Sequence, residues 1–378
     1  MSTSTQLQRS MAVATPLPFD TLLLLGFTGE EGISRLFHFQ LDLAAPNASA
    51  VAFEALLGRP VSIRLALPGG SARFISGICS RLSQGTRSTE YTTFGMEVVP
   101  AAWVLTRRAR SRIRQGASVP DILREVFQEI PDVTFELRGR YAPRDYCVQY
   151  RETDFNFASR LMEEEGIYYY FRHEAGAHHM IVSDRQEFPA LQPGALVLQP
   201  LGESILTENR ITHWEKSQRL GSTKVTLHDH TFELPHQKLA AEAWVQESVT
   251  VGRASHKLRV GKSSALEIYD WPGEYAQRFD GIDRGGHDRP ADLQEIYQDN
   301  LRTAQLRAQE EAAAAITIRG AGRYRHLCSG HTFTITERSP ETYANTPVHD
   351  GQYVLTSVSH VGRVGESYRS GGQDDDLY

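Results

Sequence analysis

Apolar and polar residues alternate in several stretches of the chain and predict β-strands. In YTTFGMEVV, residues 91–99, Phe94, Met96 and Val98 are separated by Thr, Gly or Glu, the period of two typical of a strand with one buried face. The same alternation appears in STKVTLHDHTF (222–232), GHTFTITER (330–338) and QYVLTSVSHV (352–361). These stretches predict one β-block near the N-terminus and a second after about residue 201.

Between the two β-blocks the apolar period changes to that of a helix. SVPDILREVFQEI (118–130) places apolar residues on one helical stripe, with Ser118 as N-cap, Pro120 in the first turn and Pro131 after the end. TDFNFASRLMEEEG (153–166) predicts a second helix, capped by Thr153 or Asp154 and ended by Gly166.

A third, longer helix is predicted from about residue 290 to 315, inside the second β-block. Its apolar stripe narrows to alanine, which suits close packing against a neighbouring element. The stripe consists of Leu293, Ile296, Tyr297, Leu301, Ala304, Ala308, Ala312 and Ala315.

These patterns predict a mainly β protein with α+β inserts. RFISGICSRL (73–82) and QYVLTSVSHV (352–361) add a faint internal repeat. The expected domains are a flexible N-terminal tail (1–16), a first β-block (17–108), an α/β insert (109–200), a second β-block (201–370) interrupted by a helical insert at about 236–316, and a C-terminal tail (371–378).

The composition is that of an ordinary soluble globular protein. Of the 378 residues 40% are hydrophobic and 23% charged, with a formal net charge of −6. No basic stretch with interleaved aromatics indicates nucleic-acid binding, and the apolar run Leu22 to Leu25 is too short for membrane insertion. The polar N-terminus predicts no signal peptide, and the widely spaced Cys79, Cys147 and Cys328 predict buried free thiols.

The stretch MEEEGIYYYFRHEAGAHHM (162–180) has the composition of a metal or acid/base site around His173, Glu174, His178 and His179. The zinc motif HExxH needs two histidines four residues apart on a helix, whereas His173 and His178 are five apart and flank a turn. A β-hairpin would supply two ligands without a third. We therefore expect an aromatic hairpin with surface histidines, and a metal-dependent hydrolase remains the alternative from another class.

Two further clusters are interpreted in the same way. His228 and His230 lie on one strand face and His236 follows a turn, but no further ligand completes a zinc site, so a solvated strand edge is expected. Glu163, Glu164 and Glu165 point in different directions on the helix and predict a solvated face or an inter-subunit salt bridge. Because a helix C-terminus disfavours negative charge, some partner should offset them. The sequence thus predicts no catalytic, cofactor-binding or metal-binding residue, and no enzyme.

The order of several motifs resembles VgrG, the spike protein of the type VI secretion system. The motifs are LLLLGFTGEEGISRLFHFQLDL (22–43), the stretch from Tyr150 to Asp184, YDWPGEY (269–275), the Ala-rich helix, LCSGHTFTIT (327–336) and GQYVLTSVSHVG (351–362). The resemblance covers about residues 20–361, and Tyr150 to Asp184 is its most specific part. At Trp271 the family more often has tyrosine.

The resemblance implies a hub like that of contractile phage tails. Two similar antiparallel β-barrels per subunit, at about 17–108 and at about 201–235 with 317–365, would give a homotrimer with a pseudo-sixfold base. That base would sit on the Hcp tube, contact baseplate components and carry effector or adaptor proteins. It would assemble in the cytoplasm and then be secreted or delivered into a target cell by the type VI apparatus.

One departure from the family concerns the end of the chain. Family members continue into a further barrel and a β-helical needle that carries a PAAR tip protein, whereas this sequence ends at GESYRSGGQDDDLY. The needle is therefore expected to be missing, so that PAAR contact is expected only through a needle outside this sequence, and trimerisation without it is expected to be weak. A baseplate hub of a contractile phage or phage-derived particle is the alternative structural role.

Overall fold

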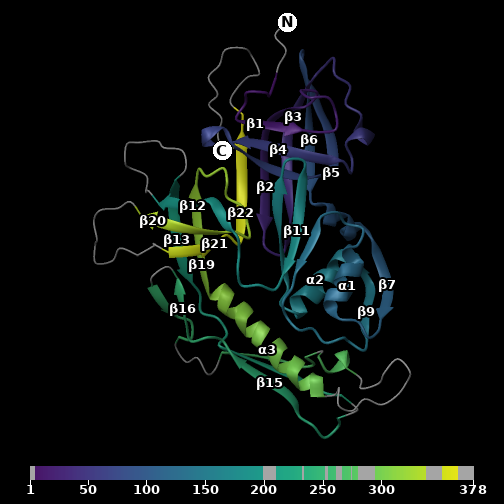
Figure 1. The fold of residues 1–378 in the computed structure, drawn as a ribbon, viewed down its shortest axis with the longest axis vertical. Helices are drawn as coiled ribbons and strands as arrows, with labels where there is room; N and C mark the ends of the chain where they lie inside the picture. Colours follow the sequence, from purple (N-terminus) through teal and green to yellow (C-terminus); the bar gives the residue numbers. More distant parts are fainter. Residues whose placement is uncertain are drawn as a thin grey trace.

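The computed structural model describes residues 5–198, 210–231, 234–251, 254–260, 266–273, 275–279, 294–337 and 351–364. About half of these residues lie in β-strands, with α1 and α2 grouped beside the first sheet and α3 crossing below it (Figure 1). The mainly β fold with α+β inserts is confirmed.

The first sheet combines strands from both ends of the chain. Its order is β1-β4-β5-β6-β3-β2-β22, and all neighbours are antiparallel. The predicted alternation in β6 is confirmed, since Phe94, Met96 and Val98 are buried. The strands are β1 (Met11–Ala14), β2 (Leu23–Gly32), β3 (Arg35–Pro46), β4 (Pro60–Ala66), β5 (Ala72–Arg87), β6 (Tyr91–Val99) and β22 (Ser357–Arg363).

The first sheet curls so that its two edges approach each other. A Cβ placed on Gly362 of β22 would lie only 2.8 Å from the sulfur of Met11 in β1. The buried Gln6 side chain then joins β1 to β2: its Nε2 donates to the carbonyl oxygens of Val13 (3.2 Å) and Leu22 (3.0 Å). The predicted flexible tail is therefore wrong for residues 5–16, because one buried amide and a paired strand fix this segment.

The α/β insert packs on the first sheet and shares its hydrophobic core. Both predicted helix caps are confirmed: the Ser118 hydroxyl accepts from the Asp121 N–H (3.4 Å) and the Thr153 hydroxyl from the Asn156 N–H (3.1 Å). Gly166 follows α2 with φ of 65°, as a helix terminator does. The elements are β7 (Ala109–Arg114), α1 (Val119–Phe127), β8 (Val133–Glu136), β9 (Cys147–Thr153), α2 (Asp154–Glu164), β10 (Tyr168–Glu174) and β11 (Ala177–Ser183).

The second half of the chain forms smaller sheets. A five-stranded sheet has the order β19-β13-β12-β20-β21, a three-stranded sheet the order β15-β14-β18, and β16 pairs with β17. These strands are β12 (Ala190–Leu198), β13 (Ile211–Gln218), β14 (Lys224–Asp229), β15 (Leu239–Trp244), β16 (Ser248–Val251), β17 (Ala254–Lys257), β18 (Glu267–Asp270), β19 (Ile316–Gly322), β20 (Thr332–Glu337) and β21 (Gly351–Val354). Short 3₁₀ turns are η1 (Phe53–Ala55), η2 (Pro68–Gly70), η3 (Ala101–Arg107) and η5 (Ala276–Arg278).

The long helix α3 (Gln294–Ala315) packs against β14 and β15. Its predicted stripe is largely confirmed, since Ile296, Ala304, Ala308 and Ala315 are buried. Leu301 is the exception at 46% exposed, and Leu293 lies outside the described residues. The alanines let the helix backbone approach the sheet closely.

Two closed, similar antiparallel barrels are not confirmed. In the five-stranded sheet β12 runs parallel to both β13 and β20, so this sheet is mixed. The predicted single strand 352–361 is divided, because Leu355 hydrogen-bonds Gly330 and His331 and the chain then crosses to pair with β2 as β22. Two predicted domain boundaries shift accordingly: β22 belongs to the first sheet, and β12 belongs to the second half. The predicted tail 371–378 lies outside the described residues.

Candidate functional site

The histidine hairpin is formed by β10 and β11. His173 lies directly opposite His178, as the hairpin prediction allowed, and Gly176 in the turn has φ of 78°. No group of three or more His, Cys, Asp or Glu side chains that could hold a metal ion occurs among the residues the structure describes. His173 and His178 thus form a cross-strand pair, and no described side chain completes a metal site with them.

The two rings are anchored on the first sheet. His178 Nε2 accepts a hydrogen bond from the Ala101 N–H (2.9 Å), and His173 Nδ1 lies 3.2 Å from both the nitrogen and the oxygen of Ser76. The Phe37 ring packs against both, with its centroid 4.9 Å from that of His173 and 5.6 Å from that of His178. The prediction of surface histidines is therefore wrong for this pair, because contacts with the first sheet cover them.

Burial keeps both histidines neutral at physiological pH. It is the main cause that lowers the pKa of His173 to about 4 and that of His178 to about 4. His179 remains at the rim, where its Nε2 is 3.6 Å from a Glu174 carboxylate oxygen. Two further contacts fix the hairpin turn: the Ser76 hydroxyl donates to the Glu174 carbonyl (2.6 Å), and the Gly176 N–H donates to the Ser62 hydroxyl (3.1 Å).

A second buried cluster surrounds Glu31 at the end of β2. Arg73 of β5 and His360 of β22 each lie 2.8 Å from Glu31 Oε1, and Cys328 and Ser329 donate to Oε2 at 3.3 Å each. Three strands of the first sheet and the segment that precedes β20 thus meet on one carboxylate.

The charge of Glu31 is stabilised by its partners. Burial raises the pKa of this carboxyl, but the His360 hydrogen bond and the Arg73 charge outweigh burial and hold its pKa well below the ordinary value. Sequence reasoning missed this cluster, although a glutamate ending the apolar strand LLLGFTGEE is an available signal. Cys79, Cys147 and Cys328 are buried and free, as predicted.

A third cluster lies at the C-terminal end of α2. Arg144 contacts Glu164 (2.6 Å) and Glu165 (2.5 Å), and Arg302 of α3 also pairs with Glu165. Arg278 also belongs to this cluster, since its Nη2 lies 3.6 Å from Glu164 Oε2. The expected partners of the glutamate-ended helix are confirmed, but the solvated face or inter-subunit bridge is wrong for Glu164 and Glu165, because arginines within the same chain cover them.

The outer face of the three-stranded sheet is aromatic and exposed. Trp244, Tyr269 and Trp271 are 49%, 60% and 58% exposed, whereas Tyr275 is fully buried. His228 lies in the central strand β14 and its Nδ1 is 3.1 Å from the Tyr269 hydroxyl, so the predicted strand edge is wrong for this residue.

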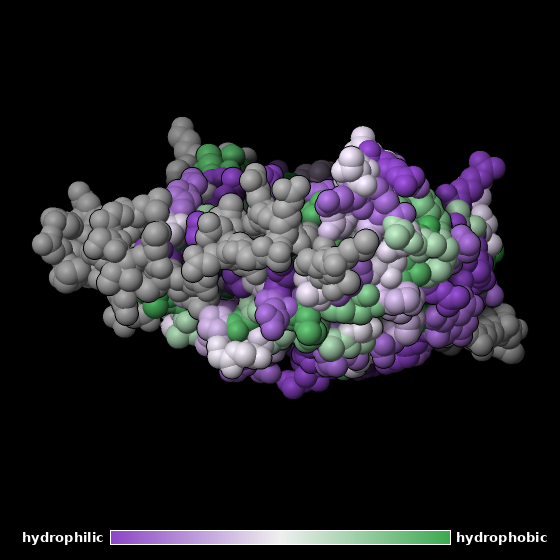
Figure 2. All heavy atoms as spheres, turned by 90° about the horizontal axis from the view of Figure 1, so that it is seen from above, coloured by the Kyte–Doolittle hydropathy of each residue, from purple (hydrophilic) through white to green (hydrophobic). Residues whose placement is uncertain are grey.

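Seen from above, the described surface carries hydrophobic residues in small separate groups among hydrophilic ones (Figure 2). No described helix is long and apolar enough to cross a membrane.

The fold and its junctions define a class of protein. The family model for the phage tail baseplate hub (GPD) matches residues 30–366, and the chain belongs to this family. A solved Escherichia coli protein, c3393, has the same fold, with a TM-score of 0.59 at 17% identity over 94% of this chain and 74% of that chain. That protein is described as a component of the type VI secretion system with structural similarity to T4 bacteriophage tail proteins gp27 and gp5.

Within the family, the chain is similar to named spike proteins, which confirms the resemblance to VgrG. It is 35% identical over 336 residues to the type VI secretion system spike protein VgrG1a of Pseudomonas aeruginosa, covering 88% of this chain and 47% of the relative. It is 37% identical over 278 residues to VgrG1c of the same organism, covering 72% and 36%. The chain thus spans less than half the length of these relatives.

Proposed function

We propose that this chain is the hub region of a type VI secretion spike, a structural part and not an enzyme. The observation that carries the proposal is the hub-family match across residues 30–366, together with the similarity to VgrG spike proteins over 88% of the chain. Three chains would form a base that sits on the Hcp tube and carries the needle and effectors. The hub would assemble in the cytoplasm and leave with the spike through the type VI apparatus.

The buried clusters support a load-bearing role. Glu31 connects the first sheet with the second half of the chain. The hairpin histidines connect the insert with the first sheet, and Glu165 connects the insert with α3. A part that transmits force must move as one body, and buried ion pairs that lose a partner cost about 3 to 5 kcal/mol. Parts held in this way resist separation.

The remaining partners follow from the same proposal. Baseplate components would contact the outside of the ring, and effector or adaptor proteins would bind to it. A Francisella structure of related fold is described as a PdpA–VgrG complex, which supports the idea of a hub bound to another protein.

A binding experiment on immobilised tube protein tests the proposal. Hexameric Hcp from the same cell and a phage tube protein are immobilised in parallel, and binding of the full chain is measured by interferometry. We expect saturable binding to Hcp that is stronger than binding to the phage protein. Stronger binding to the phage protein would instead assign the chain to a phage-derived baseplate, and binding to neither would remove the hub role.

A further inference from the structure

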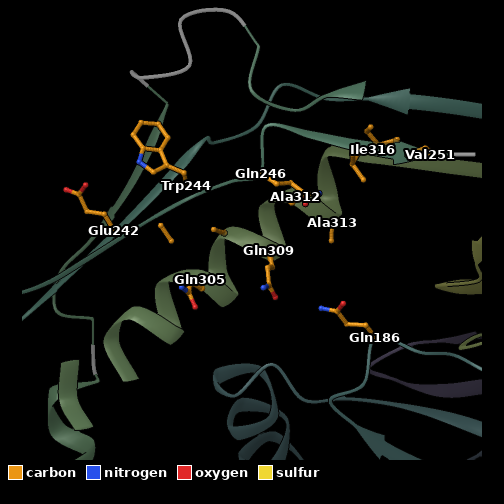
Figure 3. A pocket seen from close by; sticks show the side chains of 13 residues that line it. Gln186, Glu242, Trp244, Gln246, Val251, Gln305, Gln309, Ala312, Ala313 and Ile316 are labelled. Carbon is orange, nitrogen blue, oxygen red and sulfur yellow. The ribbon is translucent and has the colours of Figure 1, made fainter. Parts of the chain in front are cut away.

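A groove of about 750 Å³ runs along α3 in the second half of the molecule. Its floor is made by small side chains of the helix, including Ala308, Ala312 and Ala313, and one wall by Val249 and Val251 of β16. In Figure 3 the groove residues extend from Glu242 and Trp244 at one end to Gln186 at the other. The volume lies within the range of about 300 to 1,000 Å³ typical of ligand sites.

Four glutamine amides give the groove its polar character. Gln305 and Gln309 leave α3 on the side that faces Gln186, and Gln246 extends from the segment before β16 (Figure 3). Within the described residues none of the four side chains has a hydrogen-bond partner. Each amide offers two donors and an acceptor, so the groove presents both kinds of group without charge.

The strand beside the groove has an open edge. β16 pairs only with β17 among the described strands, and β17 in turn contacts β13 through Gln218, whose Nε2 donates to the Lys257 carbonyl (2.5 Å). In an antiparallel pair, alternate residues of a strand turn their N–H and C=O groups away from the partner. Those groups of β16 are therefore available to another strand.

The length of the groove sets the size of its occupant. From Gln305 to its end at Ala315 the helix rises roughly 15 Å at 1.5 Å per residue. An extended peptide advances about 3.3 Å per residue, so about five residues fit along the groove.

We propose that this groove binds an uncharged, extended segment of about five residues from a partner protein. The segment adds a strand to β16, places alternate side chains over the alanine floor of α3, and meets the glutamine amides with its remaining backbone groups. Glu242 is the one charged side chain in the described lining, so a strongly charged ligand finds no counter-charge along the floor. The inference concerns a surface separate from the tube-binding role and does not depend on it.

A displayed library of uncharged heptapeptides, selected on the full chain, tests the proposal. One enriched peptide is synthesised with a fluorescent label, and its Kd is measured by anisotropy. Ala313→Trp fills the groove from an exposed position of α3 and should raise the Kd at least about tenfold. Gln298→Trp, at an exposed position of the same helix outside the groove, should change the Kd by less than about twofold.

A second arm separates backbone pairing from simple apolar adhesion. N-methylation of alternate amides in the peptide removes donors to β16 and should raise the Kd by about tenfold. Enrichment of no peptide over the Ala313→Trp protein would overturn the proposal. Saturable, Ala313→Trp-sensitive binding of N-acetylglucosamine oligomers without peptide binding would also overturn it, since it would assign the groove to a glycan.

Discussion

At the residue scale, the Glu31 carboxylate contacts four side chains from distant parts of the chain: Arg73, Cys328, Ser329 and His360. Glu31→Gln removes the charge that compensates Arg73 while keeping a side chain of nearly the same shape. Because the Arg73 side chain is only 9% exposed, the free energy of unfolding should fall by about 3 kcal/mol, as when one partner of a buried pair is lost. Guanidinium unfolding of the full chain measures the change.

The neighbouring glutamate provides the control. Glu30 is exposed on the same strand, so Glu30→Gln should change stability by less than about 0.5 kcal/mol. Equal losses for the two variants would show that the Glu31 cluster has no special role.

Because the pKa values of His173 and His178 are lowered, the stability of the folded chain should depend on pH. Their folded pKa values of about 4 lie below the ordinary 6.5, so the unfolded chain takes up protons first as the pH falls. The contribution of the two neutral histidines to the free energy of unfolding is complete above about pH 6.5 and is lost as the pH falls toward 4. His178→Gln keeps an acceptor for the Ala101 N–H but cannot titrate, and it should lose about 2 kcal/mol less stability between pH 7 and pH 5 than the unmodified chain.

A matched variant separates this effect from a general histidine effect. The His38 side chain is 55% exposed, so His38→Gln serves as the matched histidine variant outside the hairpin. The account is contradicted if His178→Gln and the unmodified chain lose stability equally over this pH range in denaturant titrations.

At the element scale, Glu165 joins α2 to α3 through Arg302 and to Arg144. Glu165→Gln leaves Arg144 with one anionic partner fewer, so stability should fall by about 3 kcal/mol and amide exchange in α3 should accelerate. Glu163 is exposed, and Glu163→Gln removes an unfavourable charge near the helix C-terminus. This variant should leave the free energy of unfolding unchanged or raise it slightly. Amide hydrogen exchange in α3 is measured for both variants. An unchanged exchange rate in α3 after Glu165→Gln would contradict the prediction.

Elements determined by nearby residues could be predicted from the sequence. Ser118 and Thr153 cap their helices because cap and recipient are three residues apart, and the β10–β11 hairpin follows from alternation around one turn. The site contacts depend on distant partners instead: Ser76 lies 97 residues from His173, and His360 lies 329 residues from Glu31. Local patterns do not identify the distant partners in such pairs, which is why the histidines looked exposed and the Glu31 cluster was missed.

At the scale of the whole molecule, the buried junctions connect parts that the sequence pattern separates into domains. β22 lies next to β2, and Cys328 and Ser329 reach Glu31 from the second half of the chain. The family match over residues 30–366 therefore covers one interlocked hub rather than independent modules. Such a body fits the proposed role as a rigid seat on the tube.

The number of chains that bind one Hcp hexamer tests this account most directly. Light scattering coupled to size exclusion is measured for the 42.4 kDa chain alone and with hexameric Hcp. We predict three chains per Hcp hexamer in the mixture. A chain that elutes at its monomer mass at every ratio of Hcp, with no change in the Hcp peak, would contradict the assignment as a spike hub.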